Sequence, residues 1–220
     1  ASDVYKRQVK EPARCACALA RQMAEWRPDG LLRRLEHGIP PRKRQALETM
    51  MERHVHCPAT SSMGRLFDAV AFWCGFDGAA GCEGHAAMVL ESWAASLPED
   101  GPEGDSYEWV MHEEGGLLEL DWRPVLKALN DDLLAGVSRC RIARKFHESL
   151  VNLVFDVAER FSQDRLVLGG GCFQNAFLLE GLMGMAQSRA CVLSLPQRVP
   201  CNDGGISLGQ AAAAVRQWKG

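Results

Sequence analysis

The residues best suited to chemistry lie near the C-terminus, where Gly169, Gly170 and Gly171 follow an apolar segment that begins at Arg165. Glycine has no Cβ, so its backbone N–H can approach a ligand closely and its φ can take either sign. The apolar segment is typical of a short buried strand, and a helical pattern follows the glycines. Such a turn suits a phosphate, because unpaired amides and the positive end of a helix dipole face it. The alternative is that the glycines only let the strand turn into its helix.

Two details refine the interpretation of this glycine loop. Gln174 occupies the sixth position, where a dinucleotide fingerprint has glycine, and the run contains no Gly-Lys-Ser or Gly-Lys-Thr of a P-loop. The sequence therefore disfavours both of those nucleotide folds. Asn175 is expected just inside the following helix, where its amide either caps the backbone or hydrogen-bonds a ligand.

A second loop, Asn202-Asp203-Gly204-Gly205, separates a predicted strand at 190–195 from the last predicted helix. Asp203 has two interpretations there. Its carboxylate is a good N-cap for the helix. It is equally suited to bind a metal ion held near phosphate oxygens.

His54-Val55-His56-Cys57 is another group with ligand-type side chains. Two histidines and a thiol suit zinc, but one strand-like segment cannot complete a tetrahedron, and no second ligand pair follows at a usual spacing. Cys57 as a nucleophile served by His56 is disfavoured too, because adjacent side chains seldom reach the required geometry.

Hydroxyl residues at 60–62 predict the start of a helix that ends at Gly75, with Arg65 and Asp68 three residues apart on its polar face. Taken alone, these two side chains predict a surface ion pair worth less than about 1 kcal/mol. A further helix is expected from Cys82, and Glu83 in its first turn suits the helix dipole.

The remaining elements follow from periodicity and from turn residues. Residues 107–112 and 117–120 are expected to be the strands of a hairpin that flank Glu113-Glu114-Gly115-Gly116. His147 lies on the long helix after Ser138 with no predicted partner or chemistry. The other expected helices are 11–26, 31–35, 42–53 and 121–136, and 98–106 is expected to be a loop. Alternation of helices with short strands makes the fold class α/β, with large helical inserts.

Composition excludes several classes of protein. The net charge of −3 gives no general attraction to nucleic acid, so we expect no nucleic-acid partner. No run approaches the roughly 20 apolar residues that span a bilayer, and no signal peptide is evident, so we expect no membrane partner. Nine cysteines without a C-x-x-C pair indicate reduced thiols and a cytoplasmic location.

Three motifs in order resemble one known family: Thr-Ser-Ser-Met-Gly-Arg-Leu-Phe-Asp-Ala-Val at 60–70, Leu-Gly-Gly-Gly-Cys-Phe-Gln-Asn at 168–175, and Asn-Asp-Gly-Gly-Ile-Ser-Leu-Gly-Gln at 202–210. They are similar to the C-terminal, Kae1-like lobe of the HypF-type hydrogenase-maturation carbamoyltransferases. These enzymes resemble the threonylcarbamoyl-transfer proteins of tRNA modification. The resemblance implies one lobe of an actin-, Hsp70- and sugar-kinase-like (ASKHA) nucleotide-binding fold over 11–220.

The resemblance also implies a function. In the family, carbamoyl phosphate and ATP yield a carbamoyl-adenylate, and the carbamoyl group passes to the C-terminal cysteine of a hydrogenase-maturation partner to become a cyanide ligand. By this resemblance Gly169, Gly170 and Gly171 would hold phosphate, and Asp68, Glu83 and Asn175 would hold the nucleoside. Asp203 would carry a divalent metal, iron or zinc.

The chain also departs from the family pattern. Its six histidines, at 37, 54, 56, 85, 112 and 147, form no H-x-x-x-H pair, which the family uses in its metal site. No catalytic residue is assigned, and residues 1–10 are expected to be a leader or a truncation scar. We therefore expect a fragment of a larger enzyme, inactive alone. The alternatives are a small-molecule O-carbamoyltransferase of the same superfamily and a non-catalytic lobe that binds nucleotide and docks on a partner.

Overall fold

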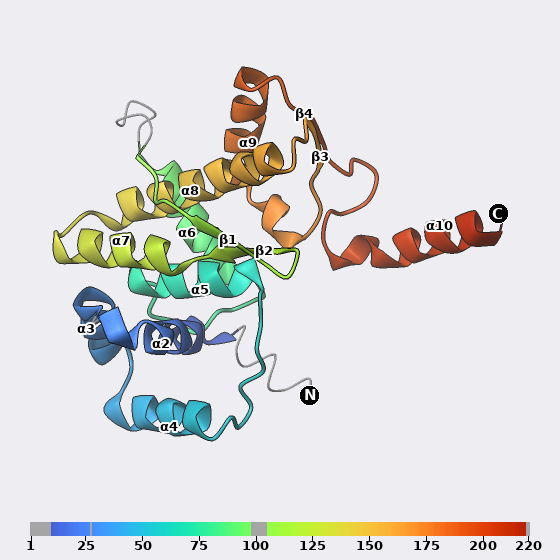
Figure 1. The fold of residues 1–220 in the computed structure, drawn as a ribbon. Helices are drawn as coiled ribbons and strands as arrows, with labels where there is room; N and C mark the ends of the chain where they lie inside the picture. The colour runs from blue at the N-terminus through green and yellow to red at the C-terminus, as the bar shows by residue number, and fades with distance from the viewer. Residues whose placement is uncertain (1–9, 27, 98–104, 219–220) are drawn as a thin grey trace. The chain divides into compact units, whose positions relative to one another are not determined.

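The computed structural model describes residues 10–26, 28–97 and 105–218 (Figure 1). The chain divides into two compact units, residues 1–149 and 150–220, and the boundary falls inside one long helix, α8. Most of the predicted leader, 1–9, and most of the predicted loop, 98–104, lie outside the described residues.

The first unit is mainly helical. Its elements are α2 (Pro12–Gln22), the short 3-10 helix η1 (Ala24–Trp26), α3 (Asp29–Gly38), α4 (Pro41–Glu52), α5 (Met63–Trp73), α6 (His85–Ala95), β1 (Val110–Glu114), β2 (Leu117–Asp121), α7 (Arg123–Leu134) and the first part of α8 (Arg139–Arg160). The helix expected over 11–26 is shorter than predicted, since α2 ends at Gln22.

Helix α5 is the centre of the first unit. It packs against both α2 and α6, and every residue from Leu66 to Trp73 is buried. The Phe67 ring meets the Phe146 ring of α8 edge to face, with centroids 5.1 Å apart. The prediction of a solvent-exposed polar face on α5 is therefore wrong, because neighbouring helices cover this helix on more than one side.

The predicted hairpin forms, but its first strand extends to Glu114, so Glu113 and Glu114 belong to β1 and not to the connection. Strands β1 and β2 pair antiparallel with Glu114 opposite Leu117, and the two residues between them, Gly115 and Gly116, have φ of +60° and +80°. Positive φ at both central residues is the mark of a type I′ turn, which matches the twist of the two strands. Asp121 then accepts the backbone N–H of Arg123 at 2.9 Å as α7 begins.

His147 on α8 is not the unpartnered side chain that the sequence predicts. It is fully buried, and its Nδ1 lies 2.8 Å from the Ala143 carbonyl oxygen, one turn back. Its ring also meets Phe67 edge to face. Burial lowers the pKa of His147 to about 4, so this side chain is a neutral part of the core at ordinary pH.

The second unit contains the end of α8, then β3 (Arg165–Val167), η2 (Gly171–Gln174), α9 (Ala176–Ser188), β4 (Val192–Ser194), η3 (Asp203–Gly205) and α10 (Ile206–Trp218). β3 and β4 pair in parallel with Leu166 opposite Leu193, so α9 is the crossover of a β-α-β unit. A Cβ at Gly181 in α9 would lie 2.9 Å from Val151 of α8, so this glycine permits close packing of the two helices.

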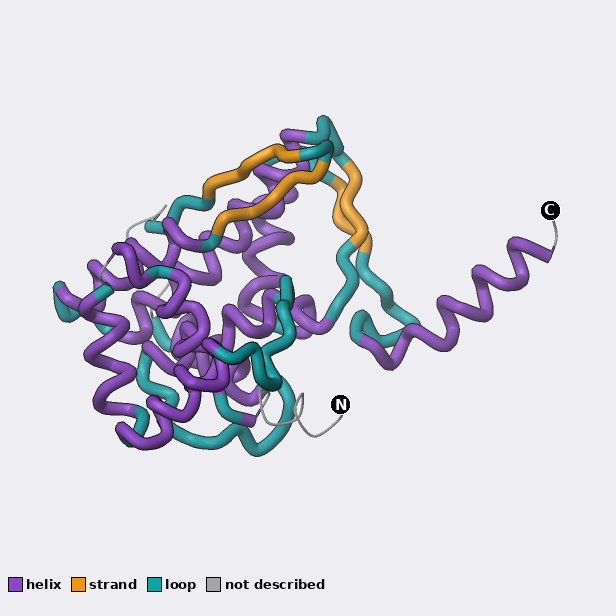
Figure 2. The backbone as a smooth tube through the Cα atoms, turned by 60° about the horizontal axis from the view of Figure 1, so that its bottom comes forward, coloured by secondary structure: helices purple, strands orange, loops and turns teal. Residues whose placement is uncertain are grey.

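The fold is mixed α/β and dominated by helix. Figure 2 shows the helices in purple and the strands, in orange, as two short pairs. Among the described residues the strands form two separate two-stranded sheets, β1–β2 and β3–β4. The predicted parallel element with the glycine loop at its carboxyl end is present in the second of these.

Candidate functional site

The glycine loop leaves the carboxyl end of β3 and is closed by its neighbour. Gly170 has φ +113° and ψ 160°, a conformation that residues with a side chain avoid. Its N–H donates to the Cys201 carbonyl at 2.6 Å. Two segments about thirty residues apart in sequence thus meet beyond the carboxyl ends of two parallel strands, where open α/β sheets bind ligands.

Three amides of this loop have no acceptor. Within residues 105–218, nothing accepts a hydrogen bond from the N–H groups of Gly169, Gly171 and Cys172. A Cβ built at Gly169, Gly170 or Gly171 would meet no atom within 4 Å. The loop therefore borders open space with unpaired donors, as an anion site requires.

The sequence predicts that the glycine loop leads directly into α9, and this prediction is wrong. The 3-10 turn η2 intervenes, and Asn175 is the N-cap of α9 rather than a residue inside it. Its Oδ1 accepts the Leu178 N–H at 2.8 Å, and the side chain is buried. The capping interpretation of Asn175 is thus confirmed, and a ligand contact stays a prediction.

The second loop is capped by a different residue from the one predicted. Asn202 Oδ1 accepts the Gly204 N–H at 3.0 Å, so Asn202 is the cap and the N-cap role expected of Asp203 is wrong. Asp203 is exposed in the first position of η3. A Cβ at Gly205 would lie 2.7 Å from the Pro200 carbonyl oxygen, so only glycine allows this loop to close so tightly.

The implied metal does not fit the side chains at hand. Across residues 10–26, 28–97 and 105–218, no group of three or more His, Cys, Asp and Glu side chains converges on one point. His54 and His56 lie in a turn, each with positive φ, rather than on the predicted strand-like segment, and Cys57 donates to the Val55 carbonyl. That Asp203 binds a metal ion stays a prediction, and the described residues do not supply the further ligands of a metal site.

Asp68 is a buried carboxylate, not half of a surface ion pair. Only 3% of the residue is exposed, and its Oδ2 lies 3.1 Å from Nη2 of Arg65. Neither Asp68 Oδ2 nor Arg65 Nη1 has a hydrogen-bond partner among the described residues. Burial raises the pKa of Asp68 to about 6, against the opposing effect of Arg65.

Glu83 lies near Asp68 but outside the helix in which it was expected. It occupies a turn before α6, whose N-cap is Gly84 with φ +76°, and its side chain is exposed. The charge of Glu83 is close enough to contribute to the raised pKa of Asp68. Two carboxylates and one guanidinium therefore share a small region of the first unit.

The predicted site residues thus form two groups. Asp68 and Glu83 belong to the first unit, and Gly169, Gly170, Gly171, Asn175 and Asp203 belong to the second. Sequence reasoning missed the Cys201 carbonyl, which no side-chain pattern reveals. It also missed the unpaired Nη1 of Arg65. The signal available for it was the spacing of Arg65 and Asp68, which places the guanidinium one helical turn from the carboxylate.

The family model "Carbamoyltransferase, Kae1-like Domain, second subdomain" matches residues 5–210, so the chain belongs to this family. The predicted resemblance to the HypF-type enzymes is confirmed.

Two curated relatives illustrate the similarity. The chain is 37% identical over 159 residues to the carbamoyltransferase HypF of Synechocystis, covering 72% of this chain and 20% of that protein. It is 34% identical over 217 residues to a HypF homolog of Cupriavidus necator, covering 95% of this chain and 54% of that one. The chain therefore spans between a fifth and about half of the length of these relatives.

A solved structure agrees over almost the whole chain. Full-length HypF in its phosphate- and nucleotide-bound form superposes with a TM-score of 0.81 at 29% identity, covering 96% of this chain and 27% of that one. The structure of T. kodakarensis HypF, at 23% identity and a TM-score of 0.57, shares the fold. No helix in the described ranges is long and apolar enough to cross a membrane.

Proposed function

We propose that this chain is the nucleotide-holding part of an ATP-dependent carbamoyltransferase. In this role it passes a carbamoyl group from carbamoyl-adenylate to the C-terminal cysteine of a [NiFe]-hydrogenase maturation partner. Membership of the carbamoyltransferase family supports the class of reaction. The carbamoyl-adenylate intermediate, the identity of the acceptor and the ASKHA fold of this lobe are proposed in addition to the class of reaction.

One observation carries the proposal: the hydrogen bond from Gly170 to the Cys201 carbonyl joins the glycine loop to the Asn202–Asp203 loop. The two loops follow parallel strands, and the glycine loop, with the unpaired N–H groups of Gly169, Gly171 and Cys172, borders open space. Such donors bind phosphate oxygens without any side chain. The similar HypF structure was solved with phosphate and nucleotide, which supports the same ligand class here.

The nucleoside is assigned to Asp68, Glu83 and Asn175. Carboxylates accept hydrogen bonds from ribose hydroxyls, and an amide can donate or accept. The buried Oδ2 of Asp68 forms an ion pair with Arg65 Nη2 but accepts no well-aligned hydrogen bond from the described residues, and such an atom gains free energy from a further donor. A ribose hydroxyl would supply that donor.

The transfer step uses a thiol from the partner. Its thiolate attacks the acyl carbon of the carbamoyl-adenylate, a C–S bond forms, the bond to the phosphate oxygen breaks, and AMP leaves with the negative charge. The amides of Gly169, Gly171 and Cys172 would stabilise that charge. Burial raises the pKa of Cys15 and Cys74 to about 12, so neither thiol is suited to attack.

The metal enters only as an expectation. Asp203 would be one ligand of a divalent cation, which would polarise the phosphate oxygens if further ligands came from elsewhere. The described residues do not supply those ligands. The proposed steps therefore rest on the amides and carboxylates of this chain.

The test is ATP binding by the 220-residue chain, measured by titration calorimetry. Gly169 and Gly171 have ordinary φ, and a methyl group at either position would meet no protein atom within 4 Å, so Gly169→Ala and Gly171→Ala should fold normally. Each methyl group would occupy the phosphate position and weaken binding at least about tenfold, or about 1.4 kcal/mol. Gly184→Ala, in open space on α9, is the matched control. Equal affinity in all four proteins would overturn the proposal.

A further inference from the structure

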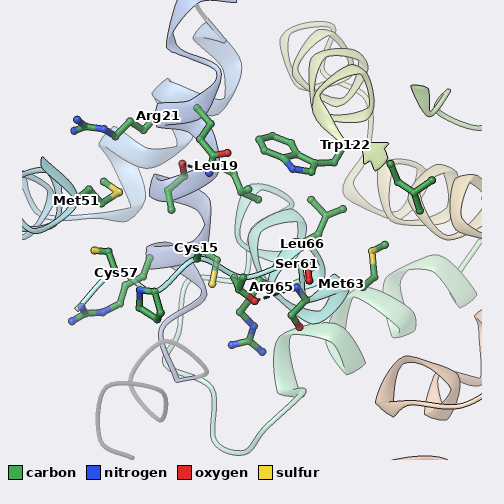
Figure 3. A pocket seen from close by; sticks show the side chains of 18 of the residues that line it. Cys15, Leu19, Arg21, Met51, Cys57, Ser61, Met63, Arg65, Leu66 and Trp122 are labelled. Atoms are coloured by element: carbon green, nitrogen blue, oxygen red, sulfur yellow. Dashed lines mark hydrogen bonds between the residues drawn. The ribbon is translucent and has the colours of Figure 1, made fainter. Parts of the chain in front are cut away.

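A large hollow lies in the first unit, and Arg65, the ion-pair partner of Asp68, is one of the residues that line it. Its volume is about 1130 Å³, and α2, α4, the 54–62 loop, α5 and the β hairpin surround it (Figure 3). Apolar side chains dominate the wall, including Leu19, Met51, Leu66 and Trp122. Methionine and leucine walls adapt to varied apolar side chains. The hollow is larger than a typical small-molecule site, which favours a polypeptide as its occupant.

Strand β2 meets this hollow along its edge. All residues from Leu117 to Leu120 line it, although successive side chains of a strand point to opposite faces. β1 pairs with the other edge of β2. Only the outer edge of β2 can therefore face the hollow along its length.

The backbone groups on that outer edge are defined by the register. A two-residue turn closes on a hydrogen-bonded pair, here Glu114 and Leu117, and the pairs alternate along the ladder. Glu119 is then bonded to β1, whereas the N–H and C=O groups of Leu118 and Leu120 point outward. In residues 105–218, no backbone partner takes the N–H of Leu118 or Leu120 outside the hairpin.

Two side-chain donors in the wall also have no acceptor. Nε1 of Trp109 and Nη1 of Arg65 are buried, and neither has a hydrogen-bond partner among the described residues. A buried donor without a partner costs about 1–3 kcal/mol. An extended polypeptide would bring carbonyl oxygens to them while its own N–H groups face β2.

We propose that a strand of the first subdomain of the Kae1-like carbamoyltransferase domain adds to the outer edge of β2 and fills this hollow. The matching family model describes a second subdomain, and the chain spans only 20–54% of two relatives. A sheet of two strands is marginal, and three or more strands give independent stability. Strand addition combines main-chain hydrogen bonds with pockets for alternate side chains.

The test identifies the occupant by photo-cross-linking in the cells that make the protein. A benzophenone amino acid replaces Leu117, which is 73% exposed and lines the hollow, and His112 on β1 is the control position. Mass spectrometry of the products should find a first-subdomain peptide from position 117 and none from 112. Cross-links to a second copy, to another protein or to nothing would overturn the proposal.

Backbone substitution separates strand addition from side-chain contact. Leu118→Pro removes an N–H that β1 does not use, as edge strands tolerate, and should abolish the cross-link. Leu118→Ala keeps the N–H and should retain it. Loss in both variants, or in neither, contradicts strand addition.

Hydrogen exchange provides a readout without substitution. In the assembly purified from the source cells, the amides of Leu118 and Leu120 should exchange at least about tenfold more slowly than in the 220-residue chain, while Glu119 stays unchanged. Exchange rates for Leu118 and Leu120 that are the same in the assembly and in the 220-residue chain would overturn the assignment of these amides to strand addition. The hollow shares no lining residue with the glycine loop or the Asn202–Asp203 loop, so failure of strand addition would leave the assignment of phosphate to those loops intact.

Discussion

The N–H of Gly170 donates to the carbonyl of Cys201 at 2.6 Å and so fixes the two loops of the candidate phosphate site against one another. Neither residue contributes a side chain to this contact. The arrangement depends on backbone geometry, which explains why glycines at 169–171, 204 and 205 accompany it. Substitutions that change the backbone should therefore affect this site more than changes of charge.

Gly205→Ala tests that dependence. Its Cβ would lie 2.7 Å from the Pro200 carbonyl oxygen, so the loop must shift, and we expect a loss of about 1–3 kcal/mol in the free energy of unfolding. ATP affinity should fall as well. Urea denaturation and calorimetry measure the two effects. Gly209→Ala, where a Cβ meets nothing within 4 Å, should leave both unchanged or add slight stability.

The buried carboxylate of Asp68 makes a prediction about pH. Its folded pKa of about 6 lies above the ordinary value of 3.8, so the folded state holds its proton more tightly. This term destabilises the fold as pH rises from about 4 to 6. Relative to wild type, Asp68→Asn should gain up to about 3 kcal/mol across that window.

Urea unfolding at several pH values checks this, with exposed Glu108→Gln as the control. A difference between wild type and Asp68→Asn that does not change with pH would contradict the raised pKa. The same variant should bind ATP more weakly, because only one of the two terminal atoms of an amide accepts hydrogen bonds, whereas both carboxylate oxygens do.

His147 should show the opposite sign. Its folded pKa of about 4 lies below the ordinary 6.5, so the unfolded chain takes up a proton first as pH falls. Stability from this term is present above about pH 6.5 and is lost toward pH 4. His147→Gln should therefore reduce the loss of stability on acidification.

Wild type and His147→Gln should differ most above pH 6.5 and converge toward pH 4 in thermal unfolding. Parallel curves would show that His147 is protonated in the core or accessible to solvent. The double variant with Asp68→Asn should lack both pH-dependent contributions to stability, because both titrating groups are gone. In the wild type these two contributions oppose one another.

Asn130→Ala removes a long-range cap. The Oδ1 of Asn130 in α7 accepts the N–H of Gly30 at 2.8 Å and of Leu31 at 3.2 Å, at the start of α3. Two buried donors lose their acceptor, so we expect a loss of about 2 kcal/mol or more in the free energy of unfolding. Chemical denaturation measures it. Gln163→Ala removes an exposed amide and should cost less than about 0.5 kcal/mol, so equal losses would contradict the capping role.

Local elements were predictable because their signals are local. Gly115 and Gly116 specify a type I′ turn through φ alone, and the hairpin register follows from it. Ser138 accepts the Arg141 N–H at the start of α8, as a hydroxyl before an apolar helix predicts. The strand, glycine loop and helix order of the second unit was visible for the same reason.

Burial and long-range partners were not predictable. Asp68 has a helical spacing from Arg65 that fits a surface pair, and only the helices packed around α5 make it a core residue. Asn130 and Gly30 are 100 residues apart, and no periodicity connects them. Asn202 and Asp203 are both good capping residues, so sequence could not decide which one caps the loop.

Amide chemical shifts of the isotopically labelled 220-residue chain, followed while ATP is added, test the central claim most directly. The account predicts that the largest shifts fall on the N–H groups of Gly169, Gly171 and Cys172, which have no acceptor within the described ranges. The amide of Gly184 on α9 should not move. Saturable binding with shifts elsewhere and none in the glycine loop would contradict the assignment of this loop to phosphate.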